Sequence, residues 1–310
     1  MQDTKKEISK QHGVRCNSPK AWLLAARPKT LAGAAVPVMI GLALAYNDIV
    51  QYEGVSFNWT AAVLCTLFAM IMQIDANFVN DFFDYAKGTD NTETRLGPRR
   101  ACAQGWVSID KMKHAIAFTT CLACLVGLPL VLYGGLEMIL IGLICVLFCF
   151  LYTTHLSYIG LGDILVVVFF GIVPICTIYY IQLQTVTWLV FLASLACGFV
   201  IDALLIVNNF RDRDTDREAG KNTIVVRIGA EKSLLLYLST GWVAYLFGIV
   251  FWMEGHPLAF VLPTIYVVLH TFTYLKIKRT NRGKALNLCL GDTARNIFIY
   301  GVTLTLGLLI

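Results

Sequence analysis

Long uninterrupted runs of apolar residues restrict the fold of this chain more than any other feature of its sequence. A helix needs about 20 apolar residues to cross the roughly 30 Å hydrocarbon core of a bilayer. Lipid offers no hydrogen-bond partner to an open backbone, so each run of this length must be helical. Nine such runs occur, at approximately 30–47, 59–80, 114–134, 136–154, 161–182, 187–207, 233–253, 257–275 and 294–310.

The composition agrees with this interpretation. Of the 310 residues, 57% are hydrophobic and only 15% are charged, which is too apolar for an ordinary soluble domain. The sequence therefore predicts an all-α, polytopic membrane protein with about nine transmembrane helices. We expect a single transmembrane domain at 30–310, preceded by a basic N-terminal segment at 1–29 and carrying cap loops near 81–113 and 208–232.

The basic residues predict the orientation of the bundle. All 25 Lys and Arg residues fall before the first run or after an even-numbered run. The connectors on the other side contain none; they are 48–58, 135, 183–186 and 254–256. Because positive charge is retained on the cytoplasmic side, we expect the N-terminus and the basic segments to be cytoplasmic, in the inner membrane if the source is bacterial.

A polar cluster follows the second apolar run, in "NDFFDYAKGTD" at 80–90. If the helix continues into this cluster, four polar residues share one of its faces, at spacings i, i+4, i+7 and i+11. These are Gln73, Asn77, Asn80 and Asp84. Such a stripe beside lipid is costly unless it faces a cavity or another helix. Asp81 lies next to the stripe, and Asp90 follows through the turn "KGT".

A second polar cluster closes the sixth run, in "NNFRDRDTDREAGK" at 208–221. Asn208, Asp212 and Asp216 repeat a helical spacing of i, i+4 and i+8. A run of mixed charges is by itself typical of a solvated helix face. The asparagines, and the start of both clusters inside apolar runs, favour a binding site instead.

The two clusters together predict a magnesium-diphosphate site. Closely spaced carboxylates repel unless a cation relieves them. Mg²⁺ prefers oxygen ligands and typically takes one or two carboxylates together with phosphate oxygens. Basic residues interleaved with the carboxylates would face the remaining phosphate charge; they are Lys87, Arg95, Arg99, Arg100, Arg211 and Lys221. An apolar cavity below the site would suit a lipid-like tail.

Both clusters resemble the Asp-rich motifs of UbiA-type intramembrane prenyltransferases, which transfer a polyprenyl chain from its diphosphate to an acceptor that is usually aromatic. Further blocks resemble the branch that acts on 1,4-dihydroxy-2-naphthoate. These blocks are "AARPKTLAGAAVPVMIG" at 25–41, "GPRRA" at 97–101, "GLGDILVVVFFGIVP" at 160–174 and "VVRIG" at 225–229. The resemblance implies a UbiA-like bundle, and it implies polyprenyl diphosphate, an aromatic acceptor and the lipid bilayer as partners. No nucleic-acid partner is expected.

The resemblance also implies roles for individual residues. Mg²⁺ would be the cofactor, held by Asp84, Asp90, Asp212 and Asp216. Catalytic roles would fall to Asp84, Asp212, Asn80 and Asp81. The diphosphate would contact Lys87, Arg99, Arg211, Lys221 and Asn208. In the naphthoate branch the attacked carbon bears a carboxylate, so the resemblance implies loss of CO₂ as well as diphosphate, giving demethylmenaquinone for menaquinone biosynthesis.

Two alternatives stay open at this point. The Asp-rich motifs recognise the diphosphate, so the same enzyme class could use 4-hydroxybenzoate, homogentisate or a glycerol phosphate lipid as acceptor. A protein of another class, a cation-coupled transporter, would also place carboxylates in membrane helices. Its ion sites are expected near midspan, whereas the acidic residues here gather at one membrane face.

Overall fold

The computed structural model describes residues 14–51, 54–88 and 95–310, and the described residues are helical with short connections. The long helices are α3 (Ala32–Gln51), α4 (Trp59–Ala86), α5 (Ile109–Gly127), α7 (Glu137–Leu151), α9 (Val173–Leu183), α10 (Trp188–Glu218), α11 (Ile224–Phe247), α14 (Thr264–Thr280) and α15 (Leu286–Leu309). The short ones are α2 (Pro19–Ala26), η1 (Pro28–Thr30), η2 (Leu128–Leu130), α6 (Val131–Gly134), η3 (Tyr152–Leu156), α8 (Gly162–Val167), η4 (Val168–Ile172), α12 (Ile249–Met253) and α13 (Pro257–Val261).

The predicted bundle of about nine membrane helices is confirmed. Within the described residues, eight helical segments are long and apolar enough to cross a membrane. The ninth predicted span corresponds to α15, which packs against α3, α10 and α14. Polar residues near the start of α15, among them Asp292 and Arg295, lower its hydropathy. The protein is therefore an integral membrane protein.

Several helices extend beyond the predicted apolar runs. The second run was predicted to end at 80, but α4 continues to Ala86; the sixth was predicted to end at 207, but α10 continues to Glu218. Backbone hydrogen bonds continue into the polar motifs, because hydropathy marks where lipid ends and not where the helix ends. Most of the predicted cap loop at 208–232 is consequently helical.

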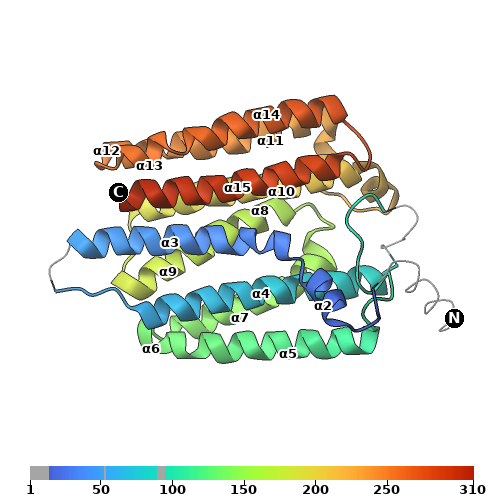
Figure 1. Ribbon diagram of the computed structural model, residues 1–310, viewed down its shortest axis with the longest axis horizontal. Coiled ribbons are helices and arrows are strands. Elements are labelled where there is room, and N and C mark those ends of the chain that lie inside the picture. The colour runs from blue at the N-terminus through green and yellow to red at the C-terminus, as the bar shows by residue number, and fades with distance from the viewer. Residues whose placement is uncertain (1–13, 52–53, 89–94) are drawn as a thin grey trace.

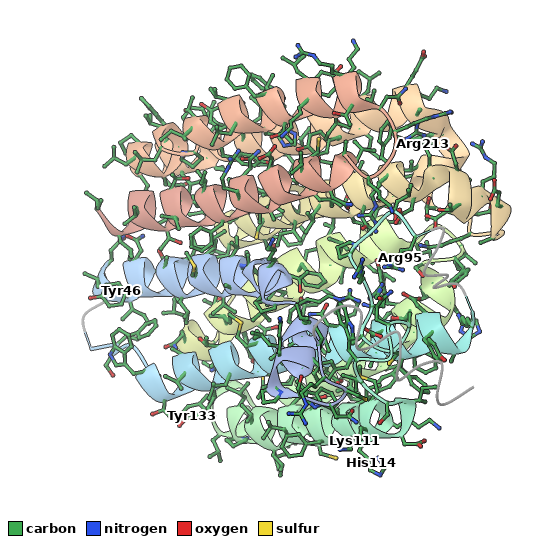
Figure 2. All side chains as sticks on the ribbon, turned by 45° about the vertical axis from the view of Figure 1, so that its right-hand side comes forward. Tyr46, Arg95, Lys111, His114, Tyr133 and Arg213 are labelled. Carbon is green, nitrogen blue, oxygen red and sulfur yellow. The ribbon has the colours of Figure 1, made fainter. Side chains whose placement is uncertain are left out.

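The helices lie side by side, and the polar connections gather at one end of the bundle (Figure 1). The segments at that end are 14–31, 95–108, 157–161, 219–223 and 281–285. Figure 2 shows the same polarity in labelled side chains, with Arg95, Arg213 and Lys111 toward this end and Tyr46 and Tyr133 at the other. Residues 95–108, which we name the cap segment, belong to the connection between α4 and α5 and lead into α5.

The short helix α2 packs against α4. Ala21 and Ala25 are buried against Phe78 in one apolar cluster. Asn77 of α4 donates from its side-chain nitrogen to the carbonyl oxygen of Ala26 at 2.9 Å. These contacts fix the polypeptide just before α3, which matters because that stretch carries an arginine of the site described below.

The central core requires close helix approach. Small residues let membrane helices pack with their backbones nearly touching. At Gly171 of η4, a Cβ would lie 2.4 Å from the carbonyl oxygen of Ser194, and at Gly198 of α10 it would lie 2.8 Å from the carbonyl oxygen of Val167. These two glycines therefore set the distance between the α8–η4 segment and α10.

We expect Gly171→Ala to destabilise the protein by about 3 kcal/mol, because overpacking of a tight contact costs that much when backbone cannot yield. Gly142→Ala on α7 is the matched control, since its Cβ would meet nothing within 4 Å. Thermal unfolding in detergent measures both. Equal melting temperatures for the two variants would contradict the close approach of η4 and α10.

Candidate active site

A cavity of about 1040 Å³ opens at the polar end of the bundle and continues among the helices. Both predicted polar stripes line it: Gln73, Asn77, Asn80 and Asp84 from α4, and Asn208, Asp212 and Asp216 from α10. The common faces predicted from helical spacing are thus confirmed, and the two clusters share one cavity. Deeper in the bundle the lining is apolar and includes Phe68, Leu143, Val146, Phe148, Phe169 and Leu204.

The two leading carboxylates each have an arginine partner. Arg100 donates from Nη2 to Oδ2 of Asp84 at 2.8 Å. Arg211 donates from Nε and Nη2 to the two oxygens of Asp212, at 2.8 and 2.5 Å. The side chains of Asp84 and Asp212 remain 23% exposed, so both still reach the cavity.

Asp216 differs from these two. Lys221 Nζ lies 3.5 Å from its Oδ1. Its Oδ2 is buried and has no hydrogen-bond partner in the structure. A buried oxygen without a partner costs free energy unless something binds to it. This oxygen is therefore suited to a ligand in the cavity.

Arg211 is fixed by a network that ties α10 to α15 and to the cap segment. It donates from Nη2 to Asn208 Oδ1 at 2.8 Å and from Nη1 to Asn287 Oδ1 at 2.9 Å. Asn287 in turn donates from Nδ2 to the carbonyl oxygen of Leu96 at 2.8 Å. At Gly97 a Cβ would lie 2.6 Å from Arg211 Nη2. The cap segment thus passes directly over the Arg211 guanidinium.

We expect Gly97→Ala to lower the rate of the prenyl transfer that the sequence resemblance implies by about 10²-fold, because displacing a positioned group by about 1 Å has effects of that size. The guanidinium of Arg211 cannot retreat without breaking its hydrogen bonds. Gly33→Ala is the control, since its Cβ would meet Phe170 at an ordinary 3.9 Å. Initial rates at matched expression measure the effect; a fully active Gly97→Ala would show that this contact does not position Arg211.

Asp81 holds the cap segment and does not line the cavity. Its carboxylate accepts hydrogen bonds from the backbone nitrogens of Ala101 at 2.8 Å and Cys102 at 2.9 Å. The side chain is buried, at 1% exposure. Burial, with the Asp81 carboxylate nearby, raises the pKa of the Cys102 thiol, which is therefore neutral.

Two arginines enlarge the basic part of the site. Arg27, between α2 and η1, lines the cavity, and its Nη2 is buried without a hydrogen-bond partner. Burial lowers the pKa of Arg27, while the charges of Asp81 and Asp84 oppose that change. Burial and the charge of Arg27 likewise lower the pKa of Arg95, opposed by Asp84 and Asp212. Arg95 lines the same cavity as Asp84 and Asp212.

Sequence reasoning missed Arg27, which precedes the first polar cluster by more than 50 residues. Its signal was present in the block "AARPKT", where a basic residue stands beside the first membrane helix on the same side as both Asp clusters. Arg95 and Arg100 were noted among the interleaved basic residues but not selected as diphosphate ligands.

Two of the selected basic residues lie elsewhere. Lys87 Nζ donates to the carbonyl oxygen of Thr154 at 2.6 Å and sits 4.3 Å from the ring centroid of Tyr158. Arg99 lines an adjoining depression of about 270 Å³, together with Lys284. Neither lines the main cavity.

The asparagines and Asp90 complete the predicted set. The hydroxyl of Thr153 donates to Oδ1 of Asn80, and Arg211 donates to Oδ1 of Asn208. Each amide oxygen thus accepts a hydrogen bond from a neighbouring side chain, and both residues line the cavity. Asp90 lies outside the described residues.

The donor set suits Mg²⁺ bound together with a phosphate ligand. No group of three or more His, Cys, Asp or Glu side chains is close enough to hold a metal ion in the part of the chain that the structure describes. Mg²⁺ usually takes only one or two carboxylates and completes its shell with water and phosphate oxygens. Carboxylates on opposite walls, with an unpartnered oxygen on Asp216, match that requirement.

Solved structures share this fold. A UbiA homolog from Aeropyrum pernix K1 superposes with a TM-score of 0.65 at 15% identity, covering 89% of this chain and 96% of that one. A UbiA homolog from Archaeoglobus fulgidus, bound to GPP and Mg²⁺, superposes with a TM-score of 0.62 at 13% identity, covering 92% and 99%.

Two curated proteins have a higher sequence identity to this chain than these solved structures have. The 1,4-dihydroxy-2-naphthoate octaprenyltransferase of Escherichia coli strain K12 is 38% identical over 219 residues, which are 68% of this chain and 69% of that protein. The protein of the same name from Haemophilus influenzae is 35% identical over 239 residues, 73% and 76% of the two chains. Residues 31–300 match the model of the UbiA prenyltransferase family. This chain belongs to the UbiA prenyltransferase family.

Proposed function

We propose that this protein transfers a polyprenyl group from polyprenyl diphosphate to 1,4-dihydroxy-2-naphthoate. Diphosphate and CO₂ leave, and demethylmenaquinol, the quinol form of demethylmenaquinone, remains, a step of menaquinone biosynthesis. The observation that carries the proposal is that the Asp-bearing faces of α4 and α10 line one shared cavity, whose deeper part is apolar. The names of the sequence relatives support the naphthoate as acceptor.

The acidic residues would hold Mg²⁺ at the diphosphate. We assign Asp84, Asp212 and Asp216 to this role, with Asn80 and Asn208 beside them. When bound, Mg²⁺ would stabilise the negative charge that develops on the departing diphosphate. Asp90 remains a predicted fourth carboxylate.

The basic residues would bind the diphosphate oxygens and stabilise the leaving group. Arg211 and Lys221, predicted from the sequence, line the cavity, and we add Arg27, Arg95 and Arg100. Arginine suits this role because its planar donors match phosphate oxygens. Lys87 and Arg99 would contribute through the local structure that they stabilise and not by direct contact.

The apolar interior would hold the polyprenyl chain and keep water from the reacting carbon. As the bond to diphosphate breaks, the allylic carbon becomes cation-like, and aromatic faces stabilise such a charge. Six aromatic side chains line the cavity: Phe68, Phe148, Tyr152, Tyr158, Phe169 and Phe170. Exclusion of water by the cap segment would prevent hydrolysis of this carbon.

We also propose that the polar end of the bundle faces the cytoplasm, in the inner membrane if the source is bacterial. The reason is the gathering of the Lys and Arg residues at this end. Residues 1–29 would then be a cytoplasmic segment, and residues 30–310 one transmembrane prenyltransferase domain.

The test uses membranes that contain the protein, 1,4-dihydroxy-2-naphthoate, a polyprenyl diphosphate and Mg²⁺, with demethylmenaquinol, or the demethylmenaquinone that air makes from it, detected by mass. We expect product with Mg²⁺ and none after chelation with EDTA. Parallel reactions with 4-hydroxybenzoate, homogentisate and a glycerol phosphate lipid compare the acceptors. Product with one of these and none with the naphthoate would reject the acceptor, and ion flux in vesicles with no product from any acceptor would reject the enzyme class.

A further inference from the structure

A second pair of acidic side chains lies closer to the membrane interior than the magnesium-diphosphate residues. Asp163 of α8 lines the cavity and is 8% exposed, and Asp202 of α10 is 4% exposed. Asp202 lies ten residues before Asp212 on the same helix, about 15 Å deeper at the usual helical rise. Neither residue belongs to the Asp-rich motifs.

Both carboxyl groups lack neutralising partners. Oδ1 of Asp163 and Oδ1 of Asp202 are buried without a hydrogen-bond partner, and neither side chain has an ion pair with any described basic residue. The two elements that carry them, α8 and α10, pack against each other. A buried carboxyl oxygen without a partner costs free energy, so two of them on packed elements call for an explanation.

The fold brings this pair together by unusual means. The π-helical turns η3 and η4 precede and follow the Asp163 segment, and such turns occur frequently at functional sites. The contacts of Gly171 and Gly198 hold that segment tightly against α10. Tyr152, the first residue of η3, also lines the cavity next to Gly162.

Membrane interiors penalise ionisable groups, so a retained pair that opens on a cavity points to a function. A packing role is less consistent with the geometry, because packing carboxylates find donors. Asp75 of α4 illustrates the difference: it is fully buried, and it accepts hydrogen bonds from the hydroxyls of Thr119 at 2.5 Å and Thr120 at 2.8 Å.

We propose that Asp163 is the proton acceptor for the ring hydroxyl of the aromatic acceptor, and that Asp202, on the packed helix α10, positions it. This assignment rests on the proposed function. Of the two, Asp163 alone lines the cavity, so Asp163 would touch the substrate and Asp202 would act through it.

The proton would move from the ring hydroxyl to Asp163 and later back to the same ring oxygen. As the allylic carbon–oxygen bond breaks, the carbon that bears the carboxylate forms a bond to the allylic carbon. The adjacent ring hydroxyl gives its proton to Asp163, and its oxygen becomes a ketone. The carboxylate then leaves as CO₂, its electron pair restores the ring enolate, and the enolate oxygen takes the proton back from Asp163. The product is demethylmenaquinol, and for this product atoms and charge balance without a further reactant.

The experiment compares Asp163→Asn, Asp163→Glu and Asp202→Asn with the parent, using 1,4-dihydroxy-2-naphthoate and ring-substituted analogues whose hydroxyl groups are more acidic. General-base catalysis contributes about 10² to 10⁴-fold, so Asp163→Asn should lose that much with the naphthoate. The activity of Asp163→Asn should approach that of the parent as the acceptor hydroxyl becomes more acidic, because such a hydroxyl ionises more readily without a base. Asp163→Glu should retain part of the parent activity.

Asp202→Asn should lose less than Asp163→Asn and keep the parent's dependence on acceptor acidity. Asp75→Asn is the matched control, a buried Asp away from the cavity, and should also keep that dependence. Binding of a prenyl diphosphate with Mg²⁺, measured by thermal shift, should be unchanged in all variants that fold.

Parent-like transfer by Asp163→Asn would overturn the proposal. So would an equal loss with every acceptor whatever its acidity, which is the result expected of a structural role. If Asp163→Asn does not fold, the Asp163→Glu variant must still show an altered dependence on acceptor acidity, and a parent-like dependence would again overturn it. Failure of the proposed function is distinct, since the parent itself would then make no product from the naphthoate.

Discussion

Replacing Asp212 with asparagine is expected to lower kcat/KM for prenyl transfer by about 10³-fold. Asparagine keeps the shape of the side chain and removes only its charge. A metal ion contributes several kcal/mol of transition-state stabilisation, and about 4 kcal/mol corresponds to about 10³-fold in rate. The same loss is expected for Asp84→Asn, since Asp84 faces the same cavity from the opposite helix.

The matched control for Asp212→Asn is Asp214→Asn. Asp214 lies two residues further along α10, its side chain is 53% exposed, and its nearest basic partner is Arg282 at 3.7 Å. Surface ion pairs of this kind contribute little, so activity should stay within a factor of two or so of the parent. Initial rates over a range of Mg²⁺ concentrations measure both. Full activity of Asp212→Asn would reject its assignment to the metal.

Asp81→Ala is expected to lower both stability and activity, although Asp81 does not line the cavity. Removing the carboxylate leaves the buried backbone nitrogens of Ala101 and Cys102 without acceptors. Each unsatisfied donor costs about 1–3 kcal/mol, so we expect a loss of about 3 kcal/mol. The cap segment carries Arg95 and Arg100, and its displacement should lower the transfer rate by about 10²-fold.

Thermal unfolding in detergent and initial rates, measured on the same preparations, separate two roles for Asp81. Asp81→Asn retains one acceptor oxygen and should show about half the loss in stability. A variant that melts like the parent but is inactive would contradict the structural role and restore the catalytic role that the sequence resemblance implied.

Much of the fold followed from hydropathy, since each long apolar run became a helix of the bundle. The ends of α4 and α10 and the start of α15 could not be predicted from hydropathy. At these positions the helix continues into polar sequence that satisfies its backbone equally well, as it does from Asn80 to Ala86. The start of α15 at Leu286 was missed because Asp292 and Arg295 interrupt its hydropathy.

The acidic half of the site was also predictable, because helical periodicity places Asp84 and Asp212 on defined faces. The basic half was harder. Arg99 and Arg100 are consecutive in an irregular segment, where no period tells which one points inward, and the structure turns Arg100 toward Asp84. Arg27 lies far away in sequence, and its inclusion depends on how α2 packs on α4.

Asp81 shows a further limit. It belongs to the same motif as Asn80 and Asp84, so sequence similarity assigned it to the same chemistry. A helix advances by about 100° per residue, and this rotation turns Asp81 away from the cavity and toward the cap segment. The role of a motif residue therefore depends on what surrounds the helix on each side.

The ion pairs of Arg100 with Asp84 and of Arg211 with Asp212 have a thermodynamic consequence. A metal ion that arrives alone competes with the arginines for the carboxylates, and a diphosphate that arrives alone competes with the carboxylates for the arginines. When both arrive together, each takes the partner that the other releases. Linkage makes this coupling reciprocal, so each ligand should raise the affinity for the other. We expect titration calorimetry to show weak binding of the metal ion or the diphosphate alone and tight binding of the two together. The site would then select prenyl diphosphate that arrives with its metal ion.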